Sequence, residues 1–82
     1  MFIVGKYYKV LRTFGTYASE VSENLSETPI DLLPHSRFLF LGSKIFNNQA
    51  IDLKILVNGK VRYLTVEFEE SQLNSYSFEE IL

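Results

Sequence analysis

The pair Asn58-Gly59, set between two runs of alternating apolar residues, constrains the fold more than any other feature of the chain. Residues 51–57 and 64–68 place apolar side chains at alternate positions, which is the period of a half-buried β-strand. A two-residue type I′ turn needs positive φ at both central residues, and Asn and Gly accept such angles most readily. The sequence therefore predicts a β-hairpin that turns at residues 58 and 59.

A two-residue turn also fixes the register of this hairpin, because paired residues must lie equally far from it. On one face, the predicted pairs are Ile51 with Val66, Leu53 with Leu64, Ile55 with Arg62, and Val57 with Lys60. On the other face, they are Asp52 with Thr65, Lys54 with Tyr63, and Leu56 with Val61. The first face is apolar far from the turn, and the second is apolar close to it.

The rest of the chain reads as shorter elements around this hairpin. Residues 37–46 are rich in aromatic and β-branched side chains and predict a central strand, with a bulge or bend at Gly42. Residues 6–11 predict a first strand, and its extension to Gly15 stays open. Residues 16–36 predict a long, acidic first loop, in which residues 16–25 fit either a helix or an extended arm.

Two short helical turns and a closing element complete the predicted order. Thr28-Pro29 carries the signature of a helix start, and Pro34 limits that helix to about one turn. Residues 71–74 predict a second helical turn. Residues 78–82 close the structure, either as a strand or as a terminal helix.

Composition indicates one globular domain that spans residues 1–82. The chain is 46% hydrophobic and 15% aromatic, and its seven Phe and five Tyr suit the dense core that so short a domain requires. It has no Cys, which excludes disulfides and thiolate metal sites. No apolar run approaches the length of a membrane span, and the first residues do not resemble a signal peptide. We therefore expect a cytoplasmic protein with no membrane contact.

In its order of elements, the chain resembles the SH3-like β-barrels. The resemblance rests on the strand at residues 6–10, the long loop at 16–36, the strand at 38–46 and the hairpin at 58–59. It implies an all-β, partly open barrel of about five antiparallel strands, with a long first loop and one or two short helical turns. The chain is also similar to small uncharacterised proteins of tailed phages.

The resemblance does not extend to the peptide-binding groove of SH3 domains. That groove uses a Trp at the start of the third strand and a Pro-x-x-Tyr motif before the last. This chain has no Trp, and Glu69-Glu70-Ser71-Gln72-Leu73 stands where the Pro and Tyr would lie. Binding of proline-rich ligands is therefore not expected.

No arrangement of residues predicts an enzyme, a metal site or a cofactor. His35 is the single histidine and lies in a loop without a second ligand or a nucleophile nearby in the sequence. The acidic pairs Glu69-Glu70 and Glu79-Glu80 place adjacent side chains on opposite faces of a strand. We expect His35 and these carboxylates to be solvated.

The predicted function is that of a protein-interaction module, with an unknown partner or with a second copy in a homodimer. Its contact surface is expected near the hairpin turn, where apolar side chains meet basic ones. The residues of this predicted patch are Lys54, Leu56, Lys60, Val61, Arg62 and Tyr63. In the alternative interpretation, Leu56 and Val61 pack beneath the long first loop as part of the core.

Binding of single-stranded nucleic acid is the second predicted function. Small barrels often stack bases on aromatic side chains of a curved sheet whose cations contact phosphates. The residues of this alternative face are Lys6, Tyr7, Tyr8, Lys9 and Tyr63, with further cations from the hairpin. The sequence pI of about 5.3 and the net charge of −2 argue against it, because dedicated nucleic-acid-binding domains are usually basic.

Overall fold

The computed structural model describes residues 2–18, 30–68 and 76–82, and in these it is an all-β protein with no helix. The strands are β1 (Tyr7–Val10), β2 (Phe14–Ala18), β3 (Ile30–Leu32), β4 (Arg37–Ile45), β5 (Ala50–Val57), β6 (Lys60–Glu67) and β7 (Phe78–Ile81). They form one antiparallel sheet in the order β3-β2-β6-β5-β4-β1-β7. The described strands therefore number seven, two more than the sequence predicted.

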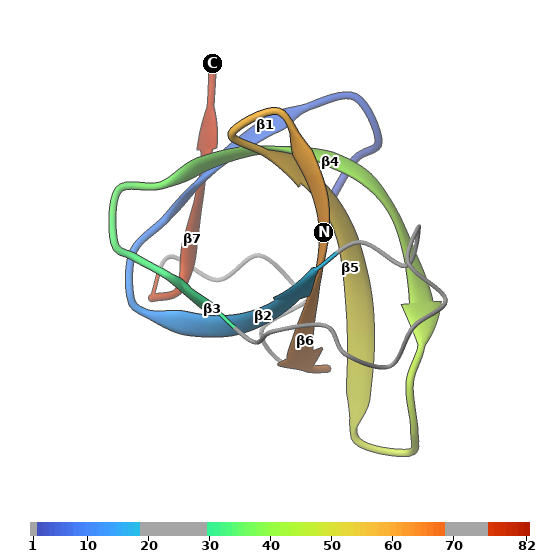
Figure 1. The fold of residues 1–82 in the computed structure, drawn as a ribbon. Helices are drawn as coiled ribbons and strands as arrows, with labels where there is room; N and C mark the ends of the chain where they lie inside the picture. Colours follow the sequence, from blue (N-terminus) through green and yellow to red (C-terminus); the bar gives the residue numbers. More distant parts are fainter. Residues whose placement is uncertain (1, 19–29, 69–75) are drawn as a thin grey trace.

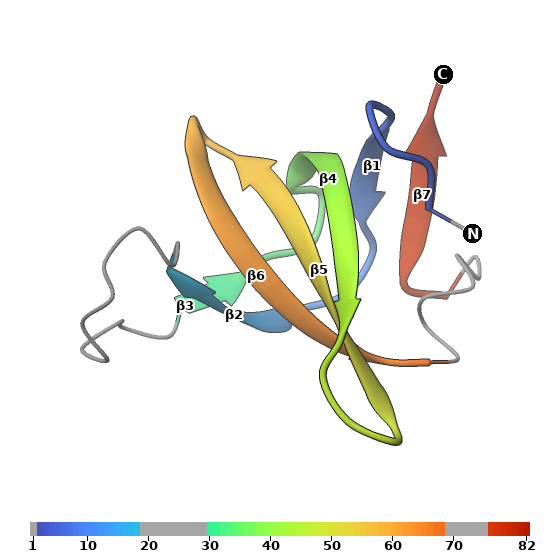
Figure 2. The same cartoon turned by 90° about the vertical axis from the view of Figure 1, so that its right-hand side faces the viewer.

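The sheet curls into a half-barrel, as Figures 1 and 2 show. The cause lies at residues 11–13, where the chain turns a corner between β1 and β2. β1 pairs with β4 and β7, whereas β2 pairs with β6 and β3. Since two consecutive strands pair with opposite ends of the β4–β5–β6 meander, the meander must bend round to meet both.

The predicted hairpin is confirmed residue by residue. All pairs of β5 with β6 from Ile51↔Val66 to Val57↔Lys60 have the predicted register. Asn58 and Gly59 have φ angles of 52° and 77°, as the two central positions of a type I′ turn require. The register alternates burial as well, with Leu53, Ile55 and Val57 directed into the core.

The predicted bulge at Gly42 and the central position of β4 are also confirmed. The register of β4 against β5 shifts between Phe40 and Gly42, and Gly42 has a φ of 153° that few other residues adopt. β4 lies between β5 and β1. The bulge bends β4, and the end of the β4–β5 hairpin then projects beyond the curled part of the sheet (Figure 2).

The core fills the inside of the curl and consists mainly of aromatic rings and aliphatic side chains. Its members are Phe2, Tyr8, Val10, Phe14, Leu32, Phe38, Phe40, Leu53, Ile55, Val57, Leu64, Val66 and Phe78. All of them lie on the inner side of their strands except Phe2, which precedes β1. The ring of Phe2 lies 4.7 Å from that of Tyr8, 5.1 Å from that of Phe78 and 5.3 Å from that of Phe40 (centroid distances). The segment before β1 thus packs an aromatic ring into the core from outside the sheet.

A second set of aromatic contacts fixes the corner between β1 and β2. The guanidinium of Arg12 lies 4.3 Å from the ring centroid of Phe14 and 5.5 Å from that of Tyr76. Its Nε donates a hydrogen bond of 3.2 Å to Oγ of Ser77. The ring of Phe14 stacks in turn on Phe78 at 5.0 Å. Arg12 therefore joins the corner to the chain that leads into β7.

The predicted helical turns are not seen in the described part of the chain. Residues 30–32 form β3 on the edge of β2, so the turn predicted to begin at Thr28 is wrong for these three residues. A strand forms there because β2 offers a free edge to pair with, and local propensity is weaker than such pairing. The turn predicted at residues 71–74 lies outside the described residues, as do residues 19–25 of the long first loop. The closing segment is a strand, β7, and not a helix.

Candidate functional site

A continuous row of apolar side chains crosses five strands on the outer face of the sheet. Ile81 lies opposite Tyr7, Tyr7 opposite Leu39, Leu39 opposite Leu56, and Leu56 opposite Val61. Paired residues in an antiparallel sheet point to the same side. We call these five residues the outer row. With strands about 4.8 Å apart, the row is about 19 Å long.

The outer row faces solvent because in β1, β4 and β5 the neighbours of its members along the strand fill the core. Tyr8 and Phe38, which adjoin row members in sequence, are 0% and 1% exposed, whereas Tyr7 is 55% exposed. Leu39, Leu56, Val61 and Ile81 are half-buried. The sheet therefore has one apolar surface covered by the core and another that the described chain leaves open.

Part of the outer row borders an open depression of about 510 Å³. Its apolar wall comes from Tyr7, Leu39, Leu56 and Ile81, and it continues to the exposed side chain of Leu82. Arg37 lies at its margin, and Asn58 and Gly59 of the hairpin turn line the end near β5. The depression thus joins the hairpin to β1 and β7, which lie far from it in the sequence.

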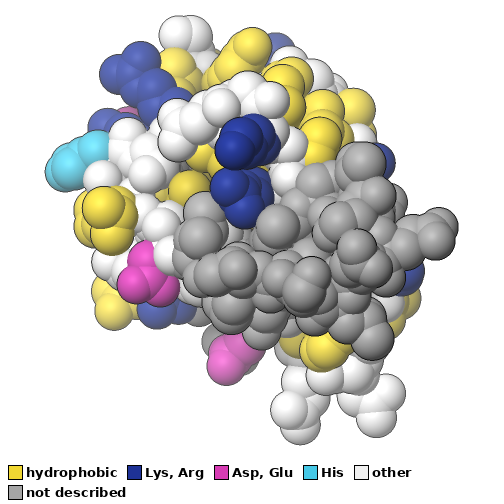
Figure 3. Space-filling model, in the orientation of Figure 1, with side chains coloured by type: hydrophobic (Ala, Val, Ile, Leu, Met, Phe, Trp, Pro, Cys, Tyr) yellow, Lys and Arg dark blue, Asp and Glu magenta, His cyan; other side chains and the backbone are white. Residues whose placement is uncertain are grey.

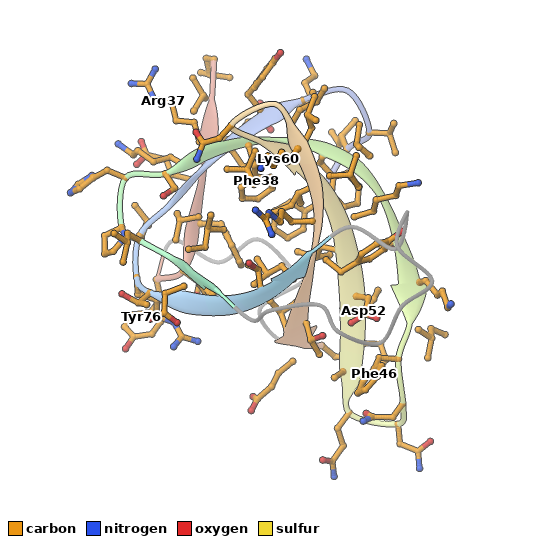
Figure 4. All side chains as sticks on the ribbon, in the orientation of Figure 1. Arg37, Phe38, Phe46, Asp52, Lys60 and Tyr76 are labelled. Carbon is orange, nitrogen blue, oxygen red and sulfur yellow. The ribbon has the colours of Figure 1, made fainter. Side chains whose placement is uncertain are left out.

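Basic side chains flank the outer row on both sides. On one side, Lys9 lies opposite Arg37 and opposite Glu79, and its Nζ is 3.5 Å from the Glu79 carboxylate. Arg37 is exposed and points away from the interior of the sheet in Figure 4, where the neighbouring Phe38 points inward. On the other side, Lys54 lies opposite Tyr63. Arg37 and Lys54 have no acidic partner within ion-pair distance among the described residues, so they add positive charge beside the outer row.

The structure divides the patch predicted at the hairpin between two faces. Lys54, Leu56, Val61 and Tyr63 lie on the outer face, as predicted. Lys60 and Arg62 do not, because they lie opposite Val57 and Ile55, whose side chains are buried in the core. The prediction that these two cations border the outer patch is therefore wrong.

Lys60 and Arg62 instead lie near the start of β6, on the inner side of the sheet. Figure 4 shows Lys60 over the interior of the curled sheet, and Figure 3 shows basic side chains near the middle of the same view. Residue Arg62 also lies opposite Ala18 of β2. A strand brings every second residue to one side, so this pair forms a surface separate from the outer row.

The residues of the alternative nucleic-acid face are divided as well. Tyr8 is wholly buried, and its hydroxyl accepts a 2.8 Å hydrogen bond from the backbone N–H of Ile3. Its ring cannot stack a base, so this part of the prediction is wrong. Lys9 pairs with Glu79, Lys6 is exposed before β1, and Tyr63 is half-buried on the outer face. Of the three tyrosines predicted for this face, Tyr7 is the one that is largely exposed.

A second apolar region lies at the projecting end of the β4–β5 hairpin. Ile45 and Phe46 are 69% and 60% exposed there, and Figure 4 shows Phe46 at this extremity. The turn itself is held by Asn47, whose Oδ1 accepts hydrogen bonds from the N–H groups of Gln49 and Ala50 at 2.7 and 2.9 Å. This region is remote from the outer row and carries fewer apolar groups.

In the described part of the chain, residues able to hold a metal ion are not gathered together. His35 is exposed in the turn before β4, where its φ is 73° and its N–H donates to the Val10 carbonyl. Within residues 2–18, 30–68 and 76–82, no three His, Asp or Glu side chains are grouped as metal ligands. The candidate site in the described part of the chain is therefore the outer row, an apolar surface that continues across five strands.

The same described residues contain no helix with the length and apolar character needed to cross a membrane. Comparisons with protein-family models, with curated proteins and with solved structures find no match to this chain.

Proposed function

We propose that this chain is a non-enzymatic, SH3-like protein-interaction module that covers its outer row with a partner protein. The observation that supports the proposal most directly is the unbroken apolar register from Ile81 to Val61. A monomer rarely leaves apolar groups aligned over five strands unless something packs on them. The layout of the curled sheet also fits the small barrels that the sequence resembles.

The flanking charges specify the kind of partner. Apolar centres with a polar rim are typical of protein interfaces, and charged residues at that rim select among partners. Arg37 and Lys54 lie on either side of the outer row without an acidic partner among the described residues. The proposed partner therefore presents aromatic or aliphatic side chains flanked by Asp or Glu.

Selection of peptides from a random displayed library tests this proposal. Peptides are selected on the wild-type protein and then measured against Tyr7→Glu and Leu56→Glu. Tyr7 is the more exposed residue, so its variant keeps the fold even if Leu56→Glu does not. We expect selected peptides rich in apolar and acidic residues, with an affinity that falls about tenfold or more in Tyr7→Glu, as for residues central to an interface.

Two matched charge-reversal variants distinguish a specific contact of the flanking cations from a general effect of net charge. Arg37→Glu should weaken the acidic peptides, whereas Lys44→Glu, an equal charge change on the same strand beyond the bulge, should not. Selected peptides that bind wild type and both outer-row variants equally would refute the proposal. Dimers in ultracentrifugation that dissociate in Tyr7→Glu would instead assign the outer row to a second copy of the chain.

Nucleic-acid binding is the competing function. Of its predicted face, Tyr8 is buried and cannot contact a nucleic acid. Titration of a single-stranded oligonucleotide at increasing salt distinguishes it. Binding whose affinity falls steeply with salt and depends on Tyr7 would favour nucleic acid. Absence of binding at low salt would remove this function.

A further inference from the structure

β7 ends the sheet and keeps one edge without a neighbouring strand in the described chain. It pairs with β1 through all four of its residues, and residues 2–18, 30–68 and 76–82 supply no strand on its other side. Figure 2 shows β7 beside β1 at one end of the sheet. An open edge offers unpaired backbone N–H and C=O groups to a further strand.

The hydrogen bonds around β1 show which groups of β7 are open. The N–H of Leu11 donates to the carbonyl of Ser77 at 2.8 Å, and the N–H of Val10 donates to Ser36 on the other side of β1 at 2.8 Å. In an antiparallel pair, successive residues direct their backbone groups to alternate sides. Ser77, Glu79 and Ile81 therefore face β1, while Phe78 and Glu80 direct their N–H and C=O groups to the open edge.

This alternation also decides which side chains would meet a new strand most closely. A strand bonded to Phe78 and Glu80 would face Glu79 and Ile81 at non-hydrogen-bonded positions, where opposed side chains lie nearest. Ile81 is the end of the outer row, and Leu82 beyond it is exposed. Glu79 lies on the same outer face.

We propose that β7 accepts an extended segment of a partner protein as an additional antiparallel strand. In the bound segment, the residue opposite Ile81 is aliphatic and prolongs the outer row. The residue two places later in that segment, opposite Glu79, is Lys or Arg. Backbone bonds to Phe78 and Glu80 supply affinity, and the two side-chain positions supply selectivity. This inference goes beyond the proposed function, because it concerns the sheet edge and a basic segment.

A second copy of β7 is a poor occupant of the same edge. The antiparallel register that bonds Phe78 to Glu80 of the other copy places the two Glu79 side chains directly opposite each other. The register shifted by two residues places the two Glu80 side chains opposite each other. Like charges in such positions destabilise strand pairing, so charge complementarity favours a basic segment over self-pairing.

A short synthetic peptide of alternating Thr and Val, with Lys two places after its central Val, tests the proposal. A second peptide has Glu in place of that Lys. We expect the Lys peptide to bind about fivefold more tightly, the effect of one favourable cross-strand charge pair. Glu79→Lys should reverse this preference, and the control Glu67→Lys, an equal charge change at the exposed last residue of β6, should preserve it.

Amide hydrogen exchange in the complex supplies a second, independent measurement. The amides of Phe78 and Glu80 should become protected on binding, whereas those of Glu79 and Ile81, already bonded to β1, should change little. Failure of both peptides to bind at millimolar concentration, or protection without this alternation, would overturn the proposal. Such failure would leave the outer-row function intact, since Tyr7→Glu tests that function with separate ligands. Dimers formed through β7 would also overturn it.

Discussion

The ring of Phe2 should contribute more to stability than any other described side chain outside the sheet. It is 9% exposed and contacts four rings, those of Tyr8, Phe38, Phe40 and Phe78. Replacement of a buried Phe by Ala costs about 3–5 kcal/mol. Phe2 lies outside the strands, where the chain can relax into part of the space that the ring leaves, so the lower value applies. We therefore expect Phe2→Ala to lower the free energy of unfolding by about 3 kcal/mol.

Urea denaturation followed by circular dichroism measures this loss, and thermal unfolding should shift by about 12–24 °C. The matched control is Val4→Ala in the same segment, because Val4 is 64% exposed and its loss should cost less than about 0.5 kcal/mol. Phe2→Leu should fall between the two, since it keeps apolar volume but loses the ring contacts. A cost below about 1 kcal/mol for Phe2→Ala would refute the reasoning and show that the core closes without this residue.

Two further predictions concern the turn and the corner of the sheet. Gly59→Ala should destabilise the protein by about 1 kcal/mol in urea denaturation, because φ is 77° at this position, whereas Gly15→Ala is the control at a glycine with open space around it and no positive φ. Arg12→Ala should cost about 1–2 kcal/mol, since it removes the contacts with Phe14 and Tyr76 and the hydrogen bond to Ser77. Arg12→Lys should recover only part of this loss, and full recovery would show that charge alone matters.

Local chemistry made the hairpin and the bulge predictable. Asn58-Gly59 permits one turn geometry, and that geometry fixes every pair of β5 with β6. Gly42 interrupts an apolar strand at a residue that tolerates unusual φ, and the register shift follows there. These features depend on residues close together in the chain.

Long-range pairing made the outer row unpredictable. The row depends on β1 lying between β4 and β7, and no sequence pattern indicates that residues 7–10 pair with 78–81. Leu39 and Ile81 were therefore missed as site residues, and so was Arg37. Tyr7 and Tyr8 adjoin in sequence and must point to opposite faces, but the sequence analysis assigned both to the surface.

The alternation of side chains along a strand could have prevented two wrong predictions, those for Tyr8 and Lys60. Tyr8 shares its face with Val10, an apolar residue suited to the core, and this parity was a signal that Tyr8 is buried. The predicted register already placed Lys60 opposite Val57, which should have removed Lys60 from the outer patch. Phe2 gave no comparable signal, because the contribution of one aromatic residue ahead of the first strand depends on the cavity it meets.

The pairing of the first strand with the last has a consequence for how the chain acquires its structure during synthesis. β4, β5 and β6 follow one another with short connections and can assemble as soon as residue 67 leaves the ribosome. β1 is made earlier, yet Tyr7 can meet Ile81 only after residue 81 has been translated. Contacts so distant along the chain form late. Until then the nascent N-terminal strand has an unprotected side, which other nascent chains or chaperones can reach.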